Sequence, residues 1–409
     1  MMWLRLALAN LGLSPLTSAV NVALMGLGTA SIVLLLLAGT QLAATLSRDA
    51  RGIDLVLGAN GSPVQLVLAA VYHADIPPGN IRQADAERWA QDPRVQTAIP
   101  LALGDSFQGF RIVGTSSAYP DLYGATPAEG RFWLNPMEAT IGSAVAASVG
   151  LTLGDRFAGA HGLVESGQSH ESSPYRVVGV LEATGTVVDR LILTSLESVW
   201  ALHDNHNHLA HSDARARPPH GEQRDQHAGD DITAMLIRYR SPLAAATLPR
   251  EVNASGSLQG ASPAMEISRV LQLVGVGLDG LKAFSWVLIA TAALSVFAAL
   301  YGSLRARRGD LAMLRCLGAS RWELLWVLLL EGLLLSVFGV TLGFLIGHSA
   351  MEVLGGWLEA TRGVALTGWV WLPAETLLLV SLFTVGIFAA AIPAVQAYRT
   401  DVARTLAES

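Results

Sequence analysis

The sequence predicts a membrane protein with four transmembrane α-helices, in which a large α+β domain and a helical stalk lie between the first helix and the second. Three observations lead to this fold class. The 409 residues are 51% apolar and only 15% charged, whereas an average soluble domain carries about 25% charged residues. Four long apolar runs account for the excess, and a long stretch of mixed composition separates the first run from the other three. This composition argues against an ordinary soluble enzyme.

The third and fourth apolar runs are each near the roughly 20 residues that a helix needs to cross a bilayer. The first run follows Arg5, as a cleaved signal peptide would, but it approaches about 30 residues, whereas the apolar region of a signal peptide has about 7–15. We therefore expect a retained helix, preceded by an interfacial segment over residues 1–16. The four predicted spans cover residues 17–46, 283–304, 324–348 and 371–394.

The interval from 47 to 264 reads as a soluble α+β domain, because short runs of β-branched and aromatic residues alternate with turns and helical stretches. Apolar residues then recur at helical spacing over 265–282, and no proline separates them from the second span. This pattern predicts a stalk helix that continues into the membrane. The predicted strands cover 110–114, 175–180, 190–194 and 232–239, and the predicted helices cover 64–73, 83–91 and 140–149.

Basic residues indicate the orientation of the chain. Arginines are concentrated in the 305–323 connection and recur in the 395–409 tail, and the positive-inside rule places such segments in the cytoplasm. With four spans, both termini are then cytoplasmic, whereas the soluble domain and the 349–370 loop lie outside. For a bacterial inner (cytoplasmic) membrane, outside is the periplasm.

Counts of single residue types exclude several functions. Lys282 is the only lysine among 27 basic residues, and Leu281 and Ala283 flank it, so the sequence has no P-loop, in which a lysine must reach the phosphates of ATP. The single cysteine, Cys316, excludes an intramolecular disulfide and multi-cysteine metal sites. A net charge of -6 offers no basic surface for nucleic acid.

Short motifs resemble the MacB/FtsX-type (type VII) ABC transporter permease family. The block from Arg308 to Ser320 is similar to the cytoplasmic loop of the family, and Glu331-Gly332 with the glycines that follow is similar to its third helix. Several pieces of the soluble interval resemble the MacB-like periplasmic core domain, namely 113–115, 129–132, 141–146 and 153–155.

The resemblance implies a permease subunit, with the ATPase and its ATP and Mg²⁺ on a separate chain present in two copies. It also implies a second permease subunit, identical or different, and mechanical coupling of ATP hydrolysis to the periplasmic domain. A periplasmic metal-binding or carrier protein and membrane lipid are further expected partners. No enzyme signature occurs in the sequence, so we expect no catalytic residues.

The cytoplasmic loop is the predicted docking segment for the ATPase. Its residues suggest one or two helical turns that a glycine ends; the alternative is that the arginines only set the topology. The predicted coupling residues are Arg308, Leu311, Leu314, Arg315 and Gly318.

The third span carries two further features. Gly339, Gly343 and Gly347 lie on one helix face, where small residues allow two helices to approach closely. The sequence leaves the second span, the fourth span and a second copy open as partners. Glu331 lies about two turns into this span; a carboxylate there is costly, and we expect it to reach the interface or to pair with an arginine of 305–321.

Histidines are concentrated in the 201–231 interval, where the family pattern is interrupted. Imidazole is a strong zinc ligand, so one interpretation is Zn²⁺ binding and a link to metal homeostasis. The other is a solvated loop, which the neighbouring proline, glycine and arginine residues favour. The candidate ligands are His203, His206, His208, His211, His220 and His227.

The primary hypothesis is therefore an ABC transporter permease. The alternatives are a membrane-anchored regulator or metal sensor that acts on a periplasmic partner without transport, and a permease for lipoprotein release.

Overall fold

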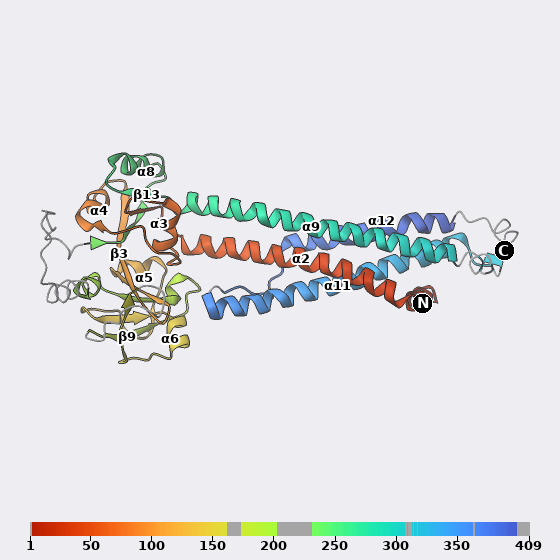
Figure 1. The fold of residues 1–409 in the computed structure, drawn as a ribbon, viewed down its shortest axis with the longest axis horizontal. Coiled ribbons are helices and arrows are strands. Elements are labelled where there is room, and N and C mark those ends of the chain that lie inside the picture. The colour runs from red at the N-terminus through yellow and green to blue at the C-terminus, as the bar shows by residue number, and fades with distance from the viewer. Residues whose placement is uncertain are drawn as a thin grey trace, which may run out of the picture. The chain divides into compact units, whose positions relative to one another are not determined.

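The computed structural model describes residues 2–161, 173–202, 231–306, 318–362 and 365–398, with the isolated positions 309, 313, 315 and 316. The chain divides into two compact units. The extramembrane unit comprises Ala43–Gln272, and the membrane unit comprises Met1–Leu42 with Leu273–Ser409. The extramembrane unit is built on a sheet, whereas the membrane unit consists of helices (Figure 1).

The extramembrane unit contains one large mixed sheet with the strand order β13-β1-β12-β3-β4-β10-β6-β9-β5, to which β7 and β8 add at β9 and β3, and a small β11-β2 pair. The strands are β1 (Leu55–Gly58), β2 (Ile81–Arg82), β3 (Val95–Phe107), β4 (Phe110–Thr115), β5 (Pro127–Gly130), β6 (Glu138–Ile141), β7 (Arg156–Phe157), β8 (Ala160–His161), β9 (Tyr175–Leu181), β10 (Leu191–Thr194), β11 (Asp231–Ile232), β12 (Ala234–Tyr239) and β13 (Gln259–Ala261).

Both faces of this sheet are covered, because side chains alternate between the two faces of a strand. On one face Val56 and Leu236 join a core with the helix α3, and on the other Leu55, Leu57 and Ile237 join a second core with α8. This explains why β1 is fully buried along its length. The helices of the unit are α3 (Pro63–Ala70), α4 (Gln83–Ala90), α5 (Ala118–Leu122), α6 (Ser143–Val149), the 3-10 helix η1 (Val187–Arg190) and α8 (Ala244–Ser255).

The first and last strands of the unit are neighbours. β1 follows the first span and lies between β12 and β13, which precede the second span. Val56 faces Leu236 on one side and Ala261 on the other. The two ends of the domain therefore meet in the sheet, as the predicted insertion between two helices requires.

The membrane unit contains the four predicted apolar helices. They are α2 (Pro15–Asp49), α9 (Pro263–Ala306), α11 (Arg321–Arg362) and α12 (Pro373–Tyr398), and α1 (Met2–Leu13) precedes them. α2 and α9 are each continuous across the residues at which the two units divide. The predicted stalk and second span are thus parts of one helix.

One predicted loop is helical. We predicted 349–370 as an extramembrane loop, but α11 continues to Arg362, and Pro373 starts α12. The residues from 349 to 362 contain no proline, and most of them apart from Gly355 and Gly356 are good helix formers, so the helix can continue beyond the predicted span. At 42 residues, α11 is about 63 Å long, twice the roughly 30 Å of the hydrocarbon core.

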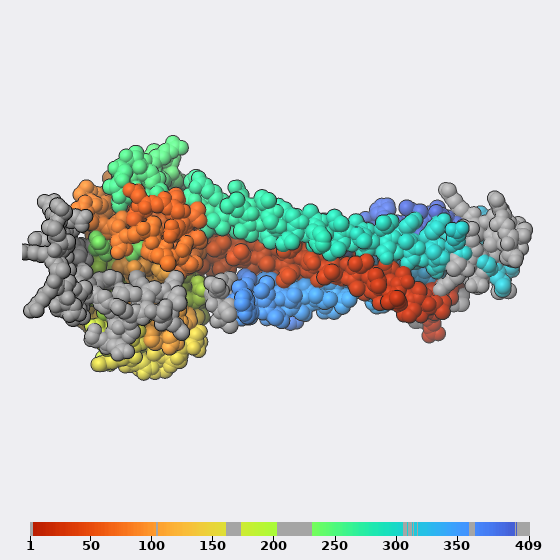
Figure 2. All heavy atoms as spheres, viewed as in Figure 1, coloured from red at the N-terminus to blue at the C-terminus, as the bar shows by residue number. Residues whose placement is uncertain are grey.

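Within the membrane unit, one side of α9 is uncovered, as the space-filling view shows (Figure 2). Leu273, Val276, Phe284 and Leu294 of α9 are each more than half exposed. Lipid or another chain covers such apolar side chains in a membrane protein.

Candidate functional site

The three aligned glycines of α11 lie against α2. A β-carbon placed on Gly343 would be 2.5 Å from Cβ of Thr29 and 2.7 Å from the carbonyl oxygen of Gly26, whereas carbon atoms in contact are normally about 3.5–4.0 Å apart. The α2 side chains nearest to Gly339 and Gly347 are Met25 and Val33. This glycine seam therefore faces the first span, which is none of the three partners that the sequence left open. At Gly343 the facing residues of α2, Gly26 and Thr29, are themselves small.

The opposite side of α2 packs on α9. A β-carbon on Gly28 would lie 2.8 Å from Cγ1 of Ile289 and 3.3 Å from the carbonyl oxygen of Ser285. Gly26 and Gly28 are two residues apart and point to different sides of the helix. α2 is therefore packed between α9 and α11 with glycine on both sides.

The intramembrane carboxylate, Glu331, is 3% exposed. The side-chain amide of Asn10 in α1 donates a hydrogen bond to it, and α1 packs on α11. A hydrogen bond reduces the cost of burying a carboxylate in an apolar environment. Sequence reasoning missed Asn10, although an asparagine within an otherwise apolar helix was a signal that could have identified it.

Two of the five predicted coupling residues, Arg315 and Gly318, are described. The Gly318 amide donates to the carbonyl of Arg315, and Gly318 has a φ of 106°, which only glycine adopts readily. The Ser320 amide then donates to Glu323, and the Glu323 amide donates to the Ser320 hydroxyl. This reciprocal capping box starts α11. The other three predicted residues, Arg308, Leu311 and Leu314, lie outside the described residues.

The last turn of α2 is anchored in the extramembrane unit. The Tyr72 hydroxyl donates to the carbonyl of Leu46, and the Tyr123 hydroxyl donates to the carbonyl of Asp49. The Asp49 carboxylate accepts the amide of Val187 at 3.1 Å. The residues of this α2 anchor were missed from the sequence, because isolated tyrosines read as ordinary core residues.

Burial determines the charge states beside this anchor. It raises the pKa of the Tyr72 and Tyr123 phenols, so both remain protonated and donate their hydrogen bonds. Nearby, His73 bonds Tyr119 through Nε2 at 2.8 Å. Burial, with the positive charges of Arg111 and Arg190, lowers the pKa of His73 to about 3. The imidazole is therefore neutral.

The first turns of α9 pack on the core that Val56 and Leu236 form with α3. Ile267 is buried in it and Leu271 packs on its edge. The buried Glu266 is paired with Arg269 at 2.8 Å. Leu46 and Ala50 at the end of α2 also pack on this core. The end of α2 and the start of α9 are therefore held by the same core of the extramembrane unit.

The predicted metal ligands cannot be placed. His203, His206, His208, His211, His220 and His227 lie outside the described residues. In the part of the chain that the structure describes, no three His, Cys, Asp or Glu side chains come together as a metal site would require.

Comparison with known proteins decides the family. Residues 18–255 match the MacB-like periplasmic core domain, and residues 282–401 match the FtsX-like permease C-terminal family. The first match covers most of α2 and of the extramembrane unit, and the second covers the later part of α9, the 305–323 connection, α11 and α12. The chain belongs to the MacB/FtsX-type ABC transporter permease family. This permease is a membrane protein with a periplasmic domain.

Two curated proteins match parts of the permease. An uncharacterized ABC transporter permease protein of Mycobacterium tuberculosis is 26% identical over 298 residues, which are 68% of this chain and 30% of that protein. The cell division protein FtsX of Bacillus subtilis is 31% identical over 93 residues, 23% of this chain and 31% of that protein. The chain thus spans about a third of the length of either relative.

Two solved structures each match about half of this chain. The periplasmic region of MacB from Actinobacillus actinomycetemcomitans is 14% identical and covers 56% of this chain and 97% of its own, with a TM-score of 0.34. The extracellular domain of the transporter YknZ from Gram-positive bacteria, also 14% identical, covers 51% of this chain and 99% of its own, with a TM-score of 0.29.

Proposed function

We propose that this permease couples ATP hydrolysis on a separate ATPase chain to a conformational change of its periplasmic domain. The observation that carries the proposal is that α2 is one continuous helix with packing contacts in the membrane unit and hydrogen bonds in the extramembrane unit. Its membrane part packs through the glycine seam, and its last turn is fixed by the α2 anchor. A packed helix transmits displacement because its neighbours cannot deform continuously.

The ATPase partner follows from the family and from the sequence. ABC permeases work with ATPases, and the 409 residues contain no P-loop. We place the docking segment at 305–323, immediately before the capping box of α11. Two ATPase copies would bind ATP and Mg²⁺ and serve two permease subunits, and this chain would itself be without catalytic activity.

The single cysteine allows a direct test of docking. Cys316 is exposed and follows Arg315 within the proposed segment. The full chain, co-expressed with the ATPases of its host and labelled with a photoactivatable maleimide, should cross-link to a P-loop ATPase that mass spectrometry identifies. The matched control is Cys316→Ser combined with Ser257→Cys, which moves the thiol to an exposed position of the extramembrane unit. Equal cross-linking from both positions, or none from Cys316, would refute the docking role.

The same two proteins test the proposed orientation in the bacterial inner membrane. With both termini in the cytoplasm, a membrane-impermeant maleimide added to spheroplasts should label the Ser257→Cys protein. It should leave Cys316 unlabelled until the membrane is opened. The reverse pattern would overturn the topology.

We further propose that the histidine-rich segment binds Zn²⁺ and links this permease to metal homeostasis, since imidazole and carboxylate side chains are frequent there. The test is the zinc content of the purified full chain, compared with a variant in which the six candidate histidines are replaced by glutamine. Equal and negligible zinc in both proteins would refute this proposal and would not affect the coupling proposal.

A second candidate function is regulation of a periplasmic partner without transport, which the match to a cell division protein favours. Reconstitution with the ATPase separates the two. ATP-dependent movement of a solute or a lipid-anchored protein supports a transporter. ATP-dependent activation of a periplasmic partner, without any such movement, supports a regulator.

A further inference from the structure

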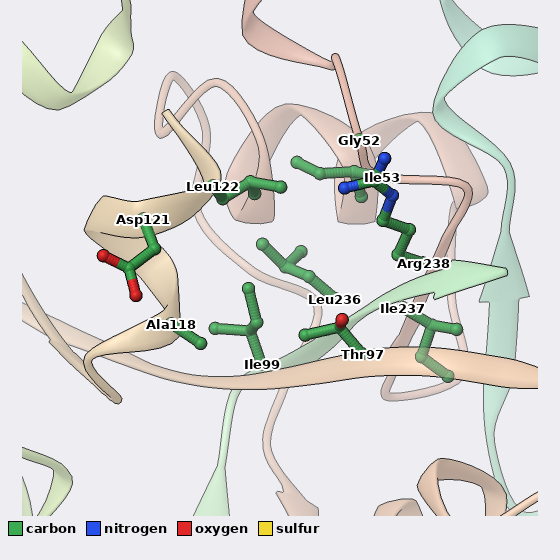
Figure 3. Close-up of a pocket in the computed structure, with 10 residues that line it drawn as sticks. All are labelled: Gly52, Ile53, Thr97, Ile99, Ala118, Asp121, Leu122, Leu236, Ile237 and Arg238. Carbon is green, nitrogen blue, oxygen red and sulfur yellow. The ribbon is translucent and has the colours of Figure 1, made fainter. Parts of the chain in front are cut away.

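A cavity of about 260 Å³ opens within the extramembrane unit, and all of its lining residues belong to that unit (Figure 3). Its floor is apolar, because Ile53, Ile99 and Leu236 are buried beneath it. One wall is α5, through Ala118 and Leu122. At about 30 Å³ for each water molecule, the space holds roughly nine waters.

Two opposite charges flank this floor. Figure 3 shows the carboxylate of Asp121 on one side of the apolar side chains and Arg238 on the other. Both residues are exposed. Within the described residues neither side chain forms an ion pair, in contrast to Arg94 and Arg131, which bind carboxylates at 2.6–2.7 Å. The two groups are therefore available to a ligand.

We propose that this cavity binds a short zwitterionic ligand with an aliphatic side chain, of the size of an amino acid or a dipeptide. The α-ammonium group would meet Asp121, the carboxylate would meet Arg238, and the aliphatic side chain would cover the floor. A pocket that is mostly apolar, with a few polar groups at its rim, is the usual form of a small-molecule site. A phosphoethanolamine lipid headgroup also carries both charges, but it has no branched apolar group to cover Ile99 and Leu236.

The cavity wall is part of the structure that holds α2. Leu122 packs closely on Gly52: a β-carbon placed on Gly52 would lie 2.8 Å from Cδ1 of Leu122. The next residue, Tyr123, donates to the carbonyl of Asp49 in the α2 anchor. A ligand in this cavity thus touches the segment that leaves the first span. Its binding does not depend on the proposed coupling function and is tested without an ATPase.

The experiment is calorimetric titration of the full chain in lipid nanodiscs with the dipeptide Gly-Leu and with leucine. We expect saturable binding of at least one. Asp121→Asn and Arg238→Gln should each weaken it by roughly 3- to 10-fold, because each removes one charged hydrogen-bonding group at an exposed site. Both positions are exposed, so the variants should fold. The matched control, Arg156→Gln on the exposed side of β7, should bind like the unchanged protein.

Blocked peptides test the orientation of the ligand. Asp121→Asn should not weaken binding of acetyl-Gly-Leu further, because that probe has already lost its cation. Arg238→Gln should likewise have no effect on Gly-Leu amide. Absence of saturable binding by both unblocked probes up to about 10 mM, a very weak affinity, overturns the proposal. So does binding that both charge variants leave unchanged, or equally strong binding of glycerophosphoethanolamine, which would assign the cavity to lipid headgroups.

Discussion

The glycine seam makes a quantitative prediction at Gly343. Gly343→Ala would place its new carbon 2.5 Å from Cβ of Thr29 and 2.7 Å from the Gly26 carbonyl oxygen. Restoring an ordinary contact of about 3.5 Å requires α2 and α11 to separate by about 1 Å. Neither neighbouring atom belongs to the end of a flexible side chain, so the backbones must move. Overpacking of this kind costs about 1–3 kcal/mol.

Gly356→Ala provides the matched control on the same helix. Gly356 is exposed, and a β-carbon there meets nothing within 4 Å. Alanine is favoured over glycine inside a helix by roughly 0.5–1 kcal/mol. The same chemical change should therefore destabilise at Gly343 and stabilise slightly at Gly356. The helix-propensity gain applies at both positions, so the two free energies of unfolding should differ by the overpacking cost, roughly 1–3 kcal/mol.

The assay is unfolding of the purified chain in mixed micelles by increasing mole fractions of a denaturing detergent. A second substitution tests the cause. Thr29→Gly in the Gly343→Ala background removes the closest atom, so it should recover part of the loss, although the Gly26 carbonyl remains in place. Equal stabilities of Gly343→Ala and Gly356→Ala would refute the packing assignment.

Three further predictions concern other buried groups. Protonation of His73 is unfavourable in the folded state, so the free energy of unfolding should fall as the pH decreases from about 6.5 towards 3, by about 1–2 kcal/mol at pH 5. Urea denaturation at several pH values measures this, and the free energy of unfolding should depend less steeply on pH in His73→Asn. Asn10→Leu should lower the free energy of unfolding by about 1–3 kcal/mol, because it removes a donor to buried Glu331. Detergent denaturation should show a smaller loss when the same change is made in a Glu331→Gln background. Tyr123→Phe should cost about 1 kcal/mol and increase hydrogen exchange in residues 46–53, since the carbonyl of Asp49 loses its donor.

The sequence predicted the layout of the fold because hydropathy reports burial in lipid directly. The four apolar helices, the inserted α+β domain and the continuity of the stalk with the second span follow from run length and periodicity. The error at 349–362 has the same origin. Hydropathy marks where a helix leaves the bilayer, whereas helix propensity allows α11 to continue to Arg362.

Contacts between distant residues could not be predicted in this way. The pairing of Asn10 with Glu331 joins residues 321 positions apart, and the anchoring tyrosines bond carbonyl groups of α2 that have no sequence signature. Periodicity showed that Gly339, Gly343 and Gly347 share a face. It could not show which helix they meet, because every span supplies an apolar surface.

The position of α2 explains why that choice was hidden. A helix at the edge of a bundle shows one face suited to its partner, but α2 carries Gly26 towards α11 and Gly28 towards α9. Its sequence is therefore apolar, with small residues on both sides, and no residue pattern distinguishes the face that meets α11 from the face that meets α9. The same arrangement bears on coupling, because a helix packed on two sides cannot shift without moving one of its neighbours. A displacement of α11, which begins at the proposed docking segment, would pass to α2 where the two helices approach most closely, at the glycine seam. Substitutions at Gly343 should therefore impair coupling even where the docking segment and the α2 anchor are unchanged.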